Sequence, residues 1–148
     1  MNLPYFMQFF LAWISSFGFA ILFNCPRKEL FACGVCGGFA WVIYTFIYLS
    51  TINEPFGVFV GAVVAAVLSR IYSYKHKAPS TVFLIPGVIP LVPGSQMYST
   101  MKAVLSINIY DTFLEAIKAL QFAGLIALAI ILIFSLPYKY FEVGKQRD

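Results

Sequence analysis

One stretch of the sequence joins helix-breaking residues to hydrogen-bonding side chains within an uncharged segment. Pro86-Gly87 and Pro93-Gly94 are two Pro-Gly pairs seven residues apart, and Pro90 lies between them. An interior proline removes a backbone N–H donor and clashes with the preceding helical turn. The spacing therefore predicts that no regular helix crosses this stretch and that some backbone carbonyls lose their usual partners.

Hydroxyl and amide side chains flank this break, and the glycines allow the chain to bend and a ligand to approach the backbone. Inside a bilayer, freed carbonyls need protein, water or ligand as partners. The N-terminus of a half-helix carries partial positive charge that suits a carboxylate. Unwound carbonyls, by contrast, suit a cation. We therefore predict a ligand-binding site at this break. Its expected residues are Ser80, Thr81, Pro86, Gly87, Pro90, Pro93, Gly94, Ser95, Gln96 and Tyr98. The alternative is a kinked helix or re-entrant loop that binds nothing.

Few ionisable residues lie near the apolar segments. Arg70 has two interpretations: its long side chain reaches the membrane surface, or it contacts the substrate carboxylate, and we include it in the predicted site. Glu115 and Lys118 have the spacing of an exposed ion pair, with proton coupling through Glu115 as the alternative. Asn53 and Glu54 are expected only to end and begin helices.

Other chemistries have little support in the sequence. His76 lies between two lysines and is expected in a solvated loop, while Cys33 and Cys36 lie in an apolar segment where thiols act as small hydrophobes. No phosphate-binding loop, dinucleotide fingerprint or nucleophile with a base is found. We therefore predict no enzyme activity, no cofactor and no metal. The basic residues gather in short loops, which argues against a nucleic-acid partner.

Composition indicates which elements position the predicted site. Hydrophobic residues make up 61% of the 148 residues and charged residues 11%, against roughly 45–50% and about 25% in soluble domains. A membrane helix needs about 20 apolar residues. The expected spans are Leu3–Phe23, Leu30–Leu49, Phe56–Tyr74, Ser80–Tyr98 and Phe113–Tyr138, with a loop at Ser99–Thr112. This predicts an all-α polytopic membrane protein with about five transmembrane helices, the fourth broken by Pro-Gly motifs, forming one membrane domain over residues 1–148.

The distribution of lysine and arginine predicts the orientation. Of the ten basic residues, eight fall on one side of the expected spans: Arg27, Lys28, Arg70, Lys75, Lys77, Lys139, Lys145 and Arg147. Lys102 and Lys118 fall on the other side. Because cytoplasmic loops are enriched in these residues, the N-terminus is expected outside and the C-terminus in the cytoplasm. Small residues at four-residue spacing, such as Gly57, Gly61, Ala65 and Ser69, are expected to form helix-packing faces.

Two stretches carry a resemblance to a known family: residues 17–27, and residues 78–98 with Ile85-Pro86-Gly87 and Pro90-Leu91-Val92-Pro93-Gly94. They resemble the small subunit of the threonine/serine exporter family. The resemblance implies export of small carboxylated metabolites, either threonine and serine or dicarboxylates such as succinate, across the bacterial plasma (inner) membrane. It also implies a separately encoded larger subunit with five spans and a cytoplasmic N-terminal region. The alternative function is an accessory subunit that stabilises a partner transporter and transports nothing itself.

Overall fold

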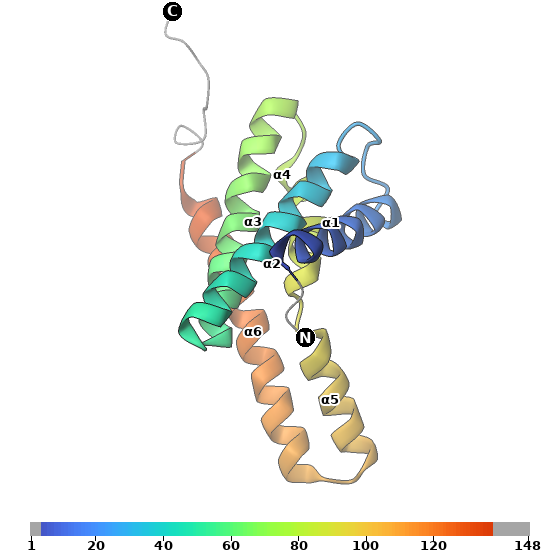
Figure 1. Cartoon of the computed structure of the whole chain (residues 1–148), viewed down its shortest axis with the longest axis vertical. Helices are drawn as coiled ribbons and strands as arrows, with labels where there is room; N and C mark the ends of the chain where they lie inside the picture. Colours follow the sequence, from blue (N-terminus) through green and yellow to red (C-terminus); the bar gives the residue numbers. More distant parts are fainter. Residues whose placement is uncertain (1–3, 138–148) are drawn as a thin grey trace, which may run out of the picture.

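The computed structural model describes residues 4–137 as helices joined by short turns, with no strand in that range (Figure 1). The elements are α1 (Tyr5–Leu22), α2 (Leu30–Thr51), α3 (Glu54–His76), α4 (Ser80–Val88), the 3-10 helix η1 (Ile89–Leu91), α5 (Gly94–Leu105) and α6 (Ile109–Ser135). Within that range α1, α2, α3 and α6 are long and apolar enough to cross a membrane, and the bent pair 80–91 and 94–105 makes a fifth crossing if it is one span. The all-α membrane fold is confirmed.

Asparagines define the starts of two long helices. The Asn53 side chain accepts a hydrogen bond from the Phe56 N–H at 3.3 Å, and Pro55 follows in the first turn of α3. The Asn108 side chain accepts from the Asp111 N–H at 3.2 Å at the start of α6. Both are N-caps, which satisfy donors that the helix itself leaves without partners. The expectation that Asn53 begins a helix is confirmed.

Helix α2 packs against α1, α3 and α4, and small residues set how close these helices come. A methyl group at Gly37 would lie 1.8 Å from the Oγ of Ser16, and one at Gly61 would lie 2.9 Å from the carbonyl oxygen of Ala40. The predicted stripe from Gly57 to Ser69 on α3 is buried. Since dispersion contacts between close backbones drive helix association in lipid, these glycines hold the bundle together.

No regular helix crosses the whole proline-rich stretch, as predicted, but helix α4 continues through Pro86 and the first proline does not interrupt it. Pro86 has no N–H to donate to the carbonyl of Val82, four residues before it. The Cys33 Sγ lies 3.3 Å from that carbonyl oxygen and the Cys25 Sγ lies 3.6 Å from it. Thiols therefore take the place of the missing amide, and the helix breaks only later, at Val92 and Pro93.

The α5–α6 hairpin, formed by α5 and the N-terminal half of α6, extends away from the other helices (Figure 1). Among the described residues, α5 packs against α6 and against no other helix, and no α5 residue is buried. The expected loop at Ser99–Thr112 is wrong, because the turn covers only residues 106–108. The sequence from Ser95 to Thr112 has no glycine or proline to interrupt a helix, and its polar residues misled the prediction.

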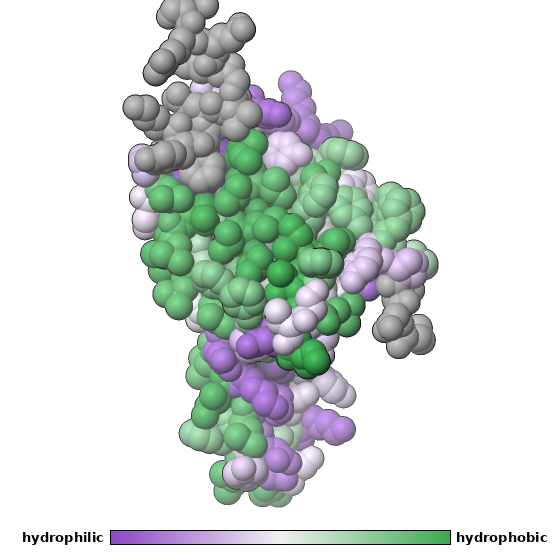
Figure 2. Space-filling view, turned by 60° about the vertical axis from the view of Figure 1, so that its left-hand side comes forward, coloured by the Kyte–Doolittle hydropathy of each residue, from purple (hydrophilic) through white to green (hydrophobic). Residues whose placement is uncertain are grey.

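The surface has the character of a membrane protein. Figure 2 shows a broad hydrophobic face over the upper body, with hydrophilic residues gathered where the α5–α6 hairpin begins. Phe6, Leu22 and Phe31 are each about seven-tenths exposed. Apolar side chains in such number require a lipid or protein environment. The multi-pass membrane character is therefore clear from both composition and surface.

The charged residues near the ends of α2 and α3 are arranged differently from the prediction. His76 belongs to the last turn of α3, not to a loop, and its Nδ1 lies 2.6 Å from the Oε2 of Glu29. It remains exposed, as expected for a residue in contact with solvent. Two predicted span boundaries lie outside the described residues 4–137: the start of the first span at Leu3 and the end of the fifth at Tyr138. The basic residues Lys139, Lys145 and Arg147 lie outside them too.

Candidate functional site

The break between η1 and α5 is an inverse γ-turn centred on Pro93. The Gly94 N–H donates to the carbonyl of Val92 at 2.7 Å, and Pro93 has φ −73° and ψ 60°, the values of that turn. The two helical pieces meet at a bend of 53°. Helix α5 therefore begins abruptly, and the backbone N–H groups of its first turn lie at the break.

A cavity of about 230 Å³, here called the hinge cavity, lies at this break. Its lining residues are Trp41, Tyr44, Glu54, Val58, Pro90, Leu91, Val92, Pro93, Gly94, Ser95, Gln96 and Phe122. Five residues of the predicted site are among them: Pro90, Pro93, Gly94, Ser95 and Gln96. The structure thus brings the second half of the proline-rich stretch together with α2, the start of α3 and the middle of α6.

Glu54 is the acidic residue of the hinge cavity, and the sequence analysis assigned it only a role at a helix end. Its Oε1 accepts hydrogen bonds from the Tyr44 hydroxyl at 3.4 Å and from the Gln96 Nε2 at 3.5 Å. The Ser95 hydroxyl donates to the Gln96 Oε1 at 2.7 Å, which turns the amide nitrogen toward Glu54. The sequence signal for this contact was an acid at the end of the third span, Glu54, together with the helix break at Pro93 in the fourth.

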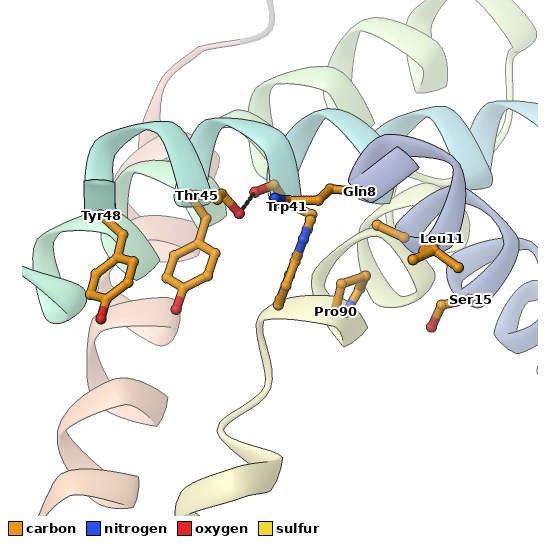
Figure 3. Close-up of a pocket in the computed structure, with 9 residues that line it drawn as sticks. Gln8, Leu11, Ser15, Trp41, Thr45, Tyr48 and Pro90 are labelled. Atoms are coloured by element: carbon orange, nitrogen blue, oxygen red, sulfur yellow. Dashed lines mark hydrogen bonds between the residues drawn. The ribbon is translucent and has the colours of Figure 1, made fainter. Parts of the chain in front are cut away.

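A second cavity of about 520 Å³, the α1–α2 cavity, adjoins the first (Figure 3). Its lining residues are Gln8, Leu11, Ala12, Ser15, Trp41, Tyr44, Thr45, Tyr48 and Pro90. Trp41, Tyr44 and Pro90 line both cavities. In Figure 3 the side chains of Trp41 and Tyr48 project from α2 on the side where Pro90 lies. The two cavities therefore meet around Pro90, and none of the α1 residues there was predicted.

The first half of the predicted site lies elsewhere. Thr81 and Pro86 line a third cavity of about 180 Å³, next to Cys25. Ser80 is buried at the start of α4. A methyl group at Gly87 would lie 3.0 Å from the Cβ of Cys36, so Gly87 serves helix packing. None of these four residues lines the hinge cavity.

Tyr98 and Arg70 also lie outside the hinge cavity. Tyr98 is 72% exposed on α5. Arg70 is buried, and its Nη1 donates to the carbonyls of Ile133 at 2.6 Å and Leu136 at 2.5 Å. Its guanidinium also lies 5.2 Å from the ring centre of Phe134. A cation that binds the last carbonyls of a helix caps it, so Arg70 closes the C-terminal end of α6.

The hinge cavity combines two opposite electrostatic features. The first turn of α5 presents the partial positive charge of a helix N-terminus, and Glu54 supplies a carboxylate.

Lys118 on α6 pairs with Glu115 at 2.7 Å, so the predicted ion pair is present. Between residues 4 and 137 no group of three or more His, Cys, Asp or Glu side chains is arranged to hold a metal ion.

Apolar spans, one of them broken at a proline, and a polar cavity beside a half-helix are features of membrane transporters. The family model described as "Threonine/Serine exporter, ThrE" matches residues 8–136. The chain belongs to the threonine/serine exporter family.

The chain is also similar to an uncharacterized protein of Haemophilus influenzae. The two are 27% identical over 95 residues, which is 64% of this chain and 32% of that protein. The chain thus matches only about a third of the length of this relative. No solved structure matches the chain.

Proposed function

We propose that this chain is a membrane subunit of a two-component secondary exporter for small carboxylated metabolites. The substrates are threonine and serine or dicarboxylates such as succinate, and the site of action is the bacterial inner membrane. The observation that carries the proposal is the hinge cavity, where a helix interrupted at Pro93 starts again beside polar side chains. Its volume of about 230 Å³ suits a metabolite of a few carbon atoms.

In the proposed mechanism the substrate carboxylate binds the first turn of α5. Backbone N–H groups and the side chains of Ser95 and Gln96 donate hydrogen bonds to it, and the helix N-terminus favours its charge. An amine or hydroxyl of the substrate faces Glu54. Access alternates between the two membrane sides as α5 turns about Pro93, and ion or substrate gradients supply the energy.

The partner of this chain is proposed to be a larger family subunit with five spans and a cytoplasmic N-terminal region. One line of support is that the chain belongs to the threonine/serine exporter family. A second is the α5–α6 hairpin, where a groove lined by Lys102, Asp111 and Glu115 cannot face lipid without cost. With the N-terminus outside and the C-terminus in the cytoplasm, a fused or paired five-span half would form an inverted repeat.

An accessory role is the second candidate, and the exposure of α5 favours it, because a helix with no buried residue needs a covering partner. The two candidates differ in what the hinge cavity does. We would express Ser95→Ala and Gln96→Ala variants with the partner and measure release of threonine, serine and succinate, together with partner abundance. An exporter subunit predicts changed substrate preference at constant partner abundance. Changed abundance with unchanged preference would support the accessory role.

A further inference from the structure

The contact between Glu54 and Gln96 joins two helices that do not pack against each other. The Oε1 of Glu54, in the first turn of α3, lies 3.5 Å from the Nε2 of Gln96, in the first turn of α5. The same oxygen lies 3.4 Å from the hydroxyl of Tyr44 on α2. One carboxylate oxygen therefore connects the body of the protein, through α2 and α3, to the helix that follows the break.

Helix α5 has little else to hold its orientation. None of its residues is buried, and it packs on α6 alone within the described residues. It lies between two turns: the γ-turn at Pro93, and residues 106–108, where Ile107 has φ 55°. A methyl group at Gly94 would meet no atom within 4 Å. The start of α5 thus has free space around it, and the side-chain contact that joins it to the body, from Gln96 to Glu54 at 3.5 Å, is at the upper limit of hydrogen-bond length.

The position of Glu54 also conflicts with the binding of an anion. A substrate carboxylate at Ser95 and Gln96 would come close to the Glu54 carboxylate, and two such charges repel each other when little water separates them. The amide nitrogen of Gln96 already serves Glu54. The Gln96 amide nitrogen carries two N–H groups, so a substrate carboxylate bound there would lie close to the Glu54 carboxylate and would repel it.

We infer that Glu54 is a positioning residue that holds α5 in the orientation seen here, and that a substrate carboxylate takes its place at Gln96 and releases α5. The first part stands on the contacts alone, and the second part rests on the proposed function. In this arrangement the protein's own carboxylate holds α5 until a substrate carboxylate arrives.

Substitutions at Glu54 separate its charge from its hydrogen bonds. Glu54→Ala removes the acceptor for both Tyr44 and Gln96, so α5 loses this connection to the body. Glu54→Gln keeps an oxygen acceptor without the charge, so α5 stays in place while repulsion of a substrate carboxylate disappears. Glu115→Ala is the matched control, because it also removes a paired carboxylate, but from the Lys118 ion pair on α6.

The test measures the distance between α5 and the body in lipid nanodiscs. Spin labels carried on unnatural amino acids at Thr51 and Ser106, both exposed, report it by pulsed electron resonance without altering the cysteines. We expect one narrow distance distribution for the unsubstituted protein, Glu54→Gln and Glu115→Ala, and a second population for Glu54→Ala. An unchanged distribution in Glu54→Ala, or equal broadening in Glu115→Ala, would overturn the positioning role.

Adding L-threonine or succinate tests the displacement step, with Trp41 fluorescence as an independent report of binding. In the unsubstituted protein, we expect either compound that binds to produce the second distance population seen in Glu54→Ala. We expect succinate to bind Glu54→Gln at least several-fold more tightly than the unsubstituted protein. Binding without a distance change would overturn the displacement step. Absence of binding by both compounds would contradict the proposed function and that step, while the distances in Glu54→Ala would still decide the positioning role.

Discussion

The Sγ of Cys33 lies 3.3 Å from the carbonyl oxygen of Val82, the group that Pro86 leaves without its helical donor. The Sγ of Cys25 lies 3.6 Å from the same oxygen. Burial raises the pKa of the Cys25 thiol above its ordinary value, and a weaker hydrogen bond with Cys33 opposes this rise. The two thiols therefore serve as donors to this carbonyl and allow α4 to pass through a proline.

Replacing Cys33 with alanine is expected to lower the stability of the detergent-solubilised protein by about 0.5–1.5 kcal/mol, because the Val82 carbonyl loses the nearer of its two thiol donors. Cys33→Ser keeps a donor and is expected to lose less. Cys36→Ala is the matched control, since Cys36 is equally buried and its loss removes the same volume. Thermal unfolding measures all three. Equal destabilisation by Cys33→Ala and Cys36→Ala would contradict the assignment.

Arg70 is expected to act on stability and not on substrate preference. Arg70→Ala removes the charged donor at the Ile133 and Leu136 carbonyls, at a cost of about 1.5–3 kcal/mol. Lys118→Ala breaks an exposed ion pair and is expected to cost much less stability than Arg70→Ala, because water screens such pairs. Thermal unfolding and export of competing substrates are measured together. A changed substrate preference in Arg70→Ala at normal abundance would place Arg70 in the site after all.

Glycines that look alike in the sequence are expected to respond differently to alanine. Gly61→Ala places a methyl group 2.9 Å from the backbone oxygen of Ala40, so α2 and α3 must separate and the protein loses stability. A methyl group at Gly124 meets no atom within 4 Å, and alanine there is expected to add about 0.5–1 kcal/mol of helix stability. If the unfolding temperatures of both variants moved in the same direction, the space around each glycine would not decide the effect of alanine.

The helical fold could be predicted because long apolar segments in a bilayer have few alternatives. The α5–α6 hairpin could not be predicted, because α5 has mixed polarity. A polar segment of that length is as typical of a loop as of a helix. Proline spacing located the break only approximately. Whether Pro86 interrupts α4 depends on Cys25 and Cys33, which lie 57 and 49 residues before Val82, and spacing within one segment carries no information about such partners.

The candidate site was predictable in part for the same reason. The second half of the proline-rich stretch lines the hinge cavity, as the idea of a half-helix terminus suggested. Glu54 comes from another helix, and its contact with Gln96 spans 42 residues. Arg70 looked like a membrane-edge cation, but its use as a cap depends on where α6 ends. Contacts between helices, not residue types, decided each of these roles.

Export by a Gly94→Leu variant tests most directly whether substrate passes through the hinge cavity. Gly94 lines the hinge cavity and has open space around it, so leucine there adds bulk at the cavity without disturbing helix packing, whereas Gly87→Leu would also press on Cys36. Gly124→Leu, on α6 with open space, is the control. We predict that Gly94→Leu reaches normal abundance and loses release of threonine, serine and succinate, while Gly124→Leu keeps it. Normal release by Gly94→Leu would contradict the account.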